Sequence, residues 1–196
     1  MTTIVLIRHA ATAWSGRRYC GRSDPPLSRE GLRAAETLAA QLAVTLPAWV
    51  RIITSPSRRA RETATILATA AAPAVLEIDA RWMEADFGVA DGLTFDDIEA
   101  RSPALAARLA AGDFDIDWPD GETVVALHDR VAAAWAAILA TGQPTVVVSH
   151  AGPIRIALAL ATDGTPADVP LPGPAEAITL EVGDASRSTQ VHLAGR

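Results

Sequence analysis

Four side chains that can bind or transfer a phosphoryl group lie at or just beyond the ends of apolar runs in this chain: Arg8, His9, Arg59 and His150. A neutral imidazole can act as a nucleophile or proton carrier near pH 7, and a guanidinium binds phosphate oxygens through paired N–H donors. Two groups of each kind, brought together, would suit phosphoryl transfer through a histidine. That reaction needs an in-line nucleophile and fixed donors for the equatorial oxygens.

The apolar runs before these residues predict strands that meet at one edge of a sheet. Residues 4–7 form the first run, residues 49–53 lead to Thr54 and Ser55, and residues 144–149 form the third. Continuous apolar, β-branched runs of this length are typical of strands buried on both faces of a parallel sheet. Because stretches with helical periodicity separate them, we expect parallel strands whose carboxyl ends share the edge where ligands bind.

The remaining segments complete an α/β protein. At 196 residues with 49% hydrophobic side chains, the chain is expected to form a single domain, residues 1–196. We expect a short strand at 75–78, one or two Ala-rich helices between 94 and 112 with a break near Ser102 and Pro103, a long amphipathic helix at 124–142, and a final pair of strands at 178–182 and 189–193.

Three further helices have recognisable start signals. Ser28 is a candidate N-cap, Ser55 and Pro56 are a candidate N-cap and first helical residue, and Pro153 is a candidate first residue of the helix after His150. The first of these helices should pack on the sheet through an apolar stripe of Leu32, Ala35, Leu38, Ala39, Leu42 and Leu46.

The helix after Ser55 carries three arginines in its first turn and a half, Arg58, Arg59 and Arg61. Cations at a helix N-terminus oppose the helix dipole, at a cost of a few tenths of a kcal/mol to about 1 kcal/mol each. An anion bound at that end would offset this cost. We therefore expect a phosphate group at the start of this helix.

Composition argues against several other kinds of chemistry. All seventeen basic residues are arginine, and Schiff-base, P-loop and kinase chemistry each need a lysine. Cys20 is the single cysteine, and the four histidines lack the close pairing of a zinc helix, so neither a metal nor another cofactor is expected. A net charge of -6 argues against nucleic acid as a partner.

The sequence also lacks the usual signs of membrane association. No apolar run approaches the roughly 20 residues that span a bilayer, and no basic segment leads into an apolar signal region. We expect a cytoplasmic protein without membrane contact.

Four ordered motifs resemble the histidine phosphatase superfamily, also called phosphoglycerate mutase-like. R-H-A at residues 8–10, followed by Thr12, is similar to the R-H-G motif of that family. Residues 55–64, S-P-S-R-R-A-R-E-T-A, are similar to its S-x-L-x-R-A-x-x-T-A segment. Residues 83–88, M-E-A-D-F-G, look like its acidic loop, and S-H-A-G at residues 149–152 is similar to its S-H-G-G motif.

The resemblance implies a three-layer αβα sandwich with a mostly parallel central sheet. It also implies that His9 attacks phosphorus and carries a phosphohistidine intermediate. Arg8, Arg59 and His150 would bind the phosphoryl oxygens. Glu84 would protonate the leaving group and then activate water.

Five further residues are expected to contact the substrate: Thr12, Ser15, Gly21, Arg22 and Ala151. Ala10 and Ala151 stand where the family usually has glycine. Alanine cannot adopt all the backbone angles open to glycine, but it is the smallest replacement, so we expect a slightly tighter phosphate pocket. Ser57 replaces the usual leucine, which should affect packing more than chemistry.

The resemblance favours hydrolysis of a small-molecule phosphomonoester over a mutase reaction, because phosphoglycerate mutases are usually longer. Residues 19–28 and 118–123 look like those of α-ribazole phosphatases, so α-ribazole 5′-phosphate, from assembly of the cobalamin nucleotide loop, is the first expectation. The same segments occur in sugar-phosphate phosphatases, so a sugar-phosphate or broad-specificity phosphatase, or a phosphoglycerate mutase, is the alternative. From another class, the chain could be a non-catalytic phosphate-binding regulatory module.

Other reactive side chains are interpreted as structural. His128 and His192 are expected to have packing or surface roles. Cys20 lies near the predicted pocket in a loop, but no histidine adjoins it in sequence, so it is not expected to be a nucleophile. The oligomeric state, monomer or homodimer, stays open.

Overall fold

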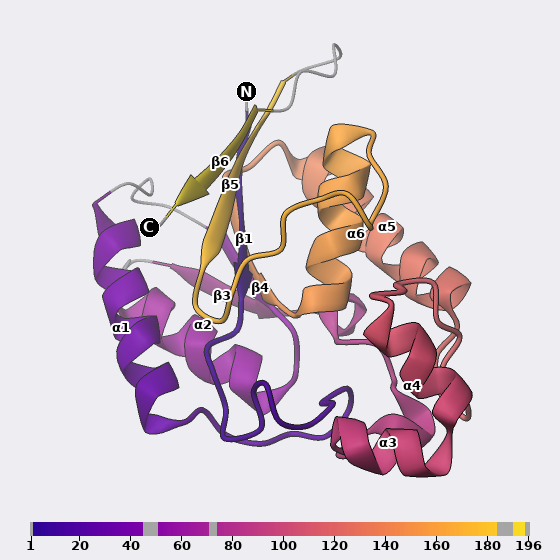
Figure 1. The fold of residues 1–196 in the computed structure, drawn as a ribbon. Helices are drawn as coiled ribbons and strands as arrows, with labels where there is room; N and C mark the ends of the chain where they lie inside the picture. The colour runs from indigo at the N-terminus through magenta and orange to yellow at the C-terminus, as the bar shows by residue number, and fades with distance from the viewer. Residues whose placement is uncertain (1, 45–50, 71–73, 184–189, 195–196) are drawn as a thin grey trace.

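The structure, a computed structural model, describes residues 2–44, 51–70, 74–183 and 190–194, the last of these for the backbone only. Its centre is one six-stranded sheet (Figure 1). The strands are β1 (Thr2–Arg8), β2 (Arg51–Thr54), β3 (Val75–Ile78), β4 (Thr145–Ser149), β5 (Ala177–Val182) and β6 (Gln190–Ala194).

The sheet is mostly parallel, as predicted. Its strand order is β3-β2-β4-β1-β5-β6, with β3, β2, β4 and β1 parallel to one another and the last two pairings antiparallel. Strand β4 therefore lies between β1 and β2. Its register pairs Ser149 with Arg8 and Val148 with Thr54, so the carboxyl ends of all three strands meet at one edge.

Helices cover both faces of the sheet and give three layers, which confirms the predicted fold class. On one face, α1 (Arg29–Ala43) and α2 (Arg58–Ala70) pack on strand residues such as Val5 and Ile7. On the other, α5 (Val124–Thr141) and α6 (Ala151–Thr162) pack on residues such as Ile4 and Leu6. The four apolar residues of β1, at positions 4–7, alternate between the two cores because successive side chains of a strand point to opposite faces.

A smaller layer lies at the end of the sheet toward which β1 runs (Figure 1). It contains α3 (Phe95–Arg101) and α4 (Pro103–Ala110), separated at Ser102 as predicted, and the short 3-10 turns η1 (Ala80–Trp82) and η2 (Gly88–Ala90). Its apolar cluster is formed by Ala90, Ile98, Leu105, Ala106 and Ile116.

Helix starts were predicted with mixed success. Ser28 does cap α1, since its hydroxyl accepts from the Gly31 N–H at 3.0 Å. The predicted start of α2 at Ser55 and Pro56 is wrong, because the helix begins at Arg58. Helix α6 begins at Ala151, so Pro153 is its third residue rather than its first, a position that still has no intrahelical N–H bond to lose.

The apolar stripe of α1 is shorter than predicted. Ala35, Leu38, Ala39 and Leu42 are buried, whereas Leu32 is 39% exposed and belongs to the solvent-facing side. The predicted contribution of Leu46, and the first two residues of the predicted strand at 49–53, lie outside the described residues.

Helix α5 is long and apolar enough, with a mean hydropathy of 1.4, to pass a length-and-composition test for a membrane span. In this fold its face of Leu127, Val131, Trp135 and Ile138 is buried against the sheet and α6. That face packs in the core, while only 28% of the helix as a whole is buried.

Candidate active site

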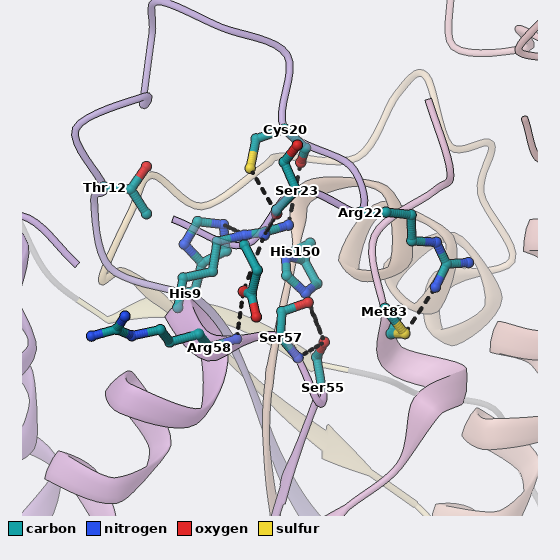
Figure 2. Close-up of polar contacts among 12 residues, drawn as sticks. His9, Thr12, Cys20, Arg22, Ser23, Ser55, Ser57, Arg58, Met83 and His150 are labelled. Atoms are coloured by element: carbon teal, nitrogen blue, oxygen red, sulfur yellow. Dashed lines mark hydrogen bonds and ion pairs between the residues drawn. The ribbon is translucent and has the colours of Figure 1, made fainter. Parts of the chain in front are cut away.

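The carboxyl ends of β1, β2 and β4 meet beside a cavity of about 190 Å³. Arg8 pairs with Ser149, the last residue of each strand. His9 and His150 follow these two residues and are therefore close neighbours. Figure 2 shows the two rings beside each other, with their centroids 5.0 Å apart. The cavity wall includes Arg8, His9, Thr12, Ser15, Arg59, Glu84 and Ala151, together with the aromatic side chains of Trp14, Tyr19 and Phe87.

The His9 ring is held in one tautomer. Its Nδ1 lies 2.8 Å from the carbonyl oxygen of Ala10, which can only accept, so Nδ1 carries the proton. Nε2 keeps a lone pair and accepts from the Nε–H of Arg59 at 3.3 Å. Burial, and then the charge of Arg59, lower the pKa of His9 to about 3. His9 is therefore a neutral imidazole whose Nε2 can attack an electrophile.

Arg59 joins the nucleophile to the loop that covers it. Its side chain is 1% exposed, and its terminal nitrogens donate to the backbone carbonyls of Cys20, Gly21 and Ser23 at 2.6 to 3.2 Å. A planar guanidinium can hold several such bonds at once. Arg59 thus fixes the loop after β1 over His9 while its Nε–H points at the reacting nitrogen.

A carboxylate of the protein bonds to the backbone at the start of α2, where we expect a phosphate group nearby. Asp24 Oδ1 accepts from the backbone N–H of Arg58 at 2.6 Å. The Arg58 side chain points away from His150 in Figure 2 and pairs with Glu62 at 2.7 Å. Of the neighbouring Arg58 and Arg59, therefore, only Arg59 lines the cavity.

His150 is fully buried behind the cavity wall. Its Nε2 lies 2.9 Å from the hydroxyl of Ser55, the residue predicted to cap α2. Burial, and then its neighbour His9, lower the pKa of His150 well below 6.5. Within the described residues its Nδ1 is buried without a hydrogen-bond partner, and so is the Nε of Arg8. A buried polar group left unpaired costs about 1–3 kcal/mol, so these two atoms are suited to a ligand that can pair with them.

Glu84 supplies a buried carboxyl to the wall of the same cavity. Its Oε1 accepts from the backbone N–H groups of Ala85 at 3.0 Å and Gly152 at 3.2 Å. Burial raises the pKa of Glu84, although these two N–H groups favour the ionised form. An added Cβ at Gly152 would lie 2.5 Å from Oε1, so the absence of a side chain there lets the carboxyl occupy this position.

Arg130 of α5 supports the site but had no clear signal in the sequence. It donates to the backbone carbonyls of Arg81, Met83 and Glu84 at 2.7 to 3.1 Å, which fixes the segment that carries the acid. The one hint in the sequence was a charged residue directly before the buried Val131 of an apolar helix. A second support, Thr63, is the threonine of the motif at residues 55–64, and it accepts from the Ala10 N–H at 3.0 Å.

The structure separates the predicted substrate-binding residues into two groups. Thr12, Ser15 and Ala151 line the cavity, but Gly21 and Arg22 do not. The Gly21 N–H donates to Asp91, and an added Cβ there would meet the Ala85 carbonyl. Arg22 instead extends toward Met83 (Figure 2), with Asp86 and Glu122 each 3.9 Å away.

The two alanines that replace glycines sit in ordinary backbone conformations. Neither Ala10 nor Ala151 has a positive φ, so neither position requires glycine for backbone reasons. Ala10 is fully buried and Ala151 is the first residue of α6. Among the described residues, no group of three or more His, Cys, Asp or Glu side chains is placed to share a metal ion.

The site combines a neutral histidine, neighbouring guanidinium groups and a buried acid around one cavity of an αβα sandwich. This combination is typical of a phosphatase-type enzyme. The chain belongs to the histidine phosphatase superfamily (branch 1), whose sequence model matches residues 4–189.

Individual relatives share the family but differ in their stated activities. The probable phosphoglycerate mutase GpmB of Klebsiella pneumoniae is 35% identical over 156 residues, which are 76% of this chain and 70% of that protein. The bifunctional protein Rv2228c of Mycobacterium tuberculosis is 36% identical over 165 residues, 83% of this chain. The chain spans only 44% of the length of that mycobacterial protein.

Solved structures agree in fold. A mycobacterial glucosyl-3-phosphoglycerate phosphatase in complex with VO3 has a TM-score of 0.84 at 27% identity, with coverage of 100% of this chain and 99% of that one. The α-ribazole phosphatase of Shigella flexneri also has a TM-score of 0.84, at 20% identity, with coverage of 98% and 95%. At that identity the second likeness concerns the fold alone.

Proposed function

We propose that this protein hydrolyses a small-molecule phosphomonoester through a phosphohistidine at His9, without a metal or other cofactor. One observation carries the proposal: His9 Nε2 is a neutral nucleophile beside Arg59 and two unpaired buried nitrogens, Arg8 Nε and His150 Nδ1. A phosphoryl group could accept hydrogen bonds from Arg59 and from those nitrogens, which would free the Nε2 lone pair for attack.

The reaction has two steps, and Glu84 gives up a proton in the first and takes one in the second. In the first, His9 Nε2 bonds to phosphorus as the bond from phosphorus to the leaving oxygen breaks, and Glu84 gives that oxygen its proton. In the second, Glu84 takes a proton from water, the water oxygen bonds to phosphorus and the N–P bond breaks. Inorganic phosphate leaves, His9 is neutral again and Glu84 is protonated again.

We propose two candidate classes of substrate for this reaction. α-Ribazole 5′-phosphate is the first candidate on the resemblance of residues 19–28 and 118–123. A phosphorylated sugar or glycerate is the alternative, and it is supported by the names of two relatives, a probable phosphoglycerate mutase and a glucosyl-3-phosphoglycerate phosphatase. A cytoplasmic location, a single domain and a monomeric or dimeric state are part of the same proposal, with no nucleic acid or membrane as a partner.

A non-catalytic phosphate-binding module is the competing proposal. Such a module would need no nucleophile, so we would expect its sequence to have lost His9, Arg59, Glu84 or His150. All four are present, and all four are gathered at one site. Retention of the complete set supports catalysis.

The test is phosphate release from a panel of phosphomonoesters in the presence of EDTA. The panel includes α-ribazole 5′-phosphate, fructose bisphosphates and 3-phosphoglycerate, with His9→Ala as the control. We expect release by the natural chain, none by the variant, and an acid-labile, alkali-stable ³²P label on the natural chain after rapid quenching. Full turnover by His9→Ala would refute the proposed nucleophile, and phosphate binding without release would favour the binding module.

A further inference from the structure

A second cavity adjoins the first on the side of the acid. Its volume is about 180 Å³, which is large enough for a six-membered ring, since an engineered cavity of about 150 Å³ admits benzene. Glu84, Phe87 and Ala151 line both cavities. The carboxyl that would protonate the leaving oxygen is therefore part of the wall between them, and a leaving group bound there would have its oxygen beside Glu84.

Aromatic side chains form much of the wall of this second cavity. Phe87 and Trp118 have ring centroids 4.3 Å apart, and Phe114 and Leu127 add further apolar surface. The two rings are tilted by 38° to each other, and together they give an apolar wall that suits an apolar part of a ligand.

The charges on the wall leave one cation without a carboxylate partner. Asp113 is paired with Arg108 at 2.9 Å, and Glu122 with Arg130 at 2.7 Å. Arg155 makes no hydrogen bond or ion pair with any described residue. Its guanidinium carbon lies 5.0 Å from the ring centroid of Phe114, so the stacked group keeps its N–H edge open for a partner.

Arg155 lies one turn along α6 from Ala151, on the same face of the helix. The helix N-termini that border this cavity already donate to carboxylates of the protein, the Gly152 N–H of α6 to Glu84 and the Val124 N–H of α5 to Asp117. The guanidinium of Arg155 is therefore the group on this wall that an added anion would pair with.

We propose that Arg155 binds an anionic group, a carboxylate or a second phosphate, on the leaving group of the substrate. This inference rests on the proposed function and narrows it to phosphomonoesters whose leaving group carries its own negative charge. It weighs against α-ribazole 5′-phosphate, because the nucleoside released from that compound has no anionic group. It favours a phosphorylated acid or a bisphosphate.

The experiment uses aryl phosphates that differ in one charge. The pairs are 4-carboxyphenyl against 4-carbamoylphenyl phosphate, and the corresponding 3-substituted compounds, which differ little in shape. The carbamoyl group withdraws electrons more strongly, so a preference for the carboxylate cannot come from a better leaving group. We expect kcat/KM to favour the carboxylate of at least one pair by tenfold or more, mainly through KM, as for a charge-assisted hydrogen bond.

Two variants assign the preference. Arg155→Met keeps the length of the side chain and should reduce the preference to within about twofold, while Arg155→Lys should keep part of it. Arg33→Met removes an exposed arginine of α1 and should behave as the natural chain. Equal rates for both members of both pairs, or a preference that survives in Arg155→Met, would overturn the proposal.

Calorimetric binding of the same compounds to His9→Ala separates this inference from the proposed function. A carboxylate preference that depends on Arg155 in binding, without hydrolysis by the natural chain, would support the anion site and refute the phosphatase. Hydrolysis by the natural chain without any carboxylate preference would support the phosphatase and refute the anion site.

Discussion

His9 is a nucleophile because of what its two ring nitrogens touch. The Ala10 carbonyl holds the proton on Nδ1, and Arg59 both lowers the pKa of the ring and occupies the lone pair of Nε2 until a better acceptor arrives. A histidine exposed to water would have a pKa near 6.5 and would be partly protonated at mildly acidic pH. Individual contacts of a few ångströms therefore decide the chemistry here.

Removal of the cavity arginine should affect activity far more than removal of its neighbour. Arg59→Ala loses a donor to the phosphoryl group and the anchor of the loop at residues 20–23, so we expect kcat to fall on the order of a hundredfold or more. Arg58→Ala removes an exposed side chain paired only with Glu62 and should change kcat less than about twofold. Steady-state kinetics on both variants checks this, and equal effects would contradict the assignment of Arg59.

The pH profile should be bounded by two groups shifted in opposite directions. The pKa of His9 is lowered to about 3, so the nucleophile stays unprotonated down to about that pH. The pKa of Glu84 is raised, so the acid stays protonated at pH values above the ordinary pKa of a glutamate. The first step should slow as the pH rises through this raised pKa. Single-turnover rates of phosphoenzyme formation across pH measure both limits.

Glu84→Gln supplies the control for the pH profile. Its rate of phosphoenzyme formation should fall strongly with alkyl phosphates, whose leaving groups need a proton, and far less with 2,4-dinitrophenyl phosphate, whose leaving group needs none. Rapid-quench measurement isolates this first step from the later attack of water, and equal losses in it with both substrates would exclude Glu84 as the acid.

At the scale of elements, the site is held by helices that do not themselves react. Helix α5 fixes the acid loop through Arg130, and the first turn of α6 gives the Gly152 N–H to Glu84. The loop after β1 is fixed by Arg59 and by Asp91, which accepts from the N–H groups of Gly21 and Ser23. These contacts join elements far apart in the sequence, so each reacting group depends on several of them.

Two glycine substitutions should separate function from stability. Gly152→Ala would place a methyl group 2.5 Å from Glu84 Oε1 and displace the acid, so we expect at least a tenfold loss of kcat. Gly142 ends α5 with a φ of 59° and has no atom within 4 Å of an added Cβ. Gly142→Ala should therefore cost about 1 kcal/mol of folding free energy and leave kcat unchanged. Thermal unfolding and kinetics on both variants give the comparison.

At the scale of the molecule, the sheet is the support that places three strand ends together. Both of its faces are covered, by α1 and α2 on one side and α5 and α6 on the other. The central residues of β1 and all of β4 are thus buried, so the close packing of the core holds the strand ends that carry the site.

Loss of a core side chain should lower stability without altering the chemistry. Leu6→Ala removes a fully buried side chain of β1 and should cost about 2–5 kcal/mol of unfolding free energy. Leu139→Ala, at a position 41% exposed on α5, should cost less than about 1 kcal/mol. Denaturant unfolding measures both, and below the transition the activity per folded molecule should equal that of the natural chain. A similar cost for the two variants would contradict this account of the core.

The sequence by itself determined the order of the elements and where the reactive residues fall in it. Residues 4–7 and 146–148 are continuous apolar runs. Helical periodicity between such runs predicts parallel strands, so Arg8, His9 and His150 could be placed at one edge. Local signals of this kind depend only on which side chains face the core. They succeeded at Ser28 and at the break near Ser102, where the deciding contact lies within a few residues.

Only the tertiary structure decided which side chains enter the site and what surrounds them. It turned Arg59 inward and Arg58 outward, gave the N-terminus of α2 to Asp24, and used Ser55 to hold His150. It also formed the second cavity beside Arg155. Asp24 and Arg58 are 34 residues apart in the chain, and Ser55 and His150 are 95 residues apart. Their meeting follows from the strand order and register, which a local pattern of apolar and polar residues does not specify.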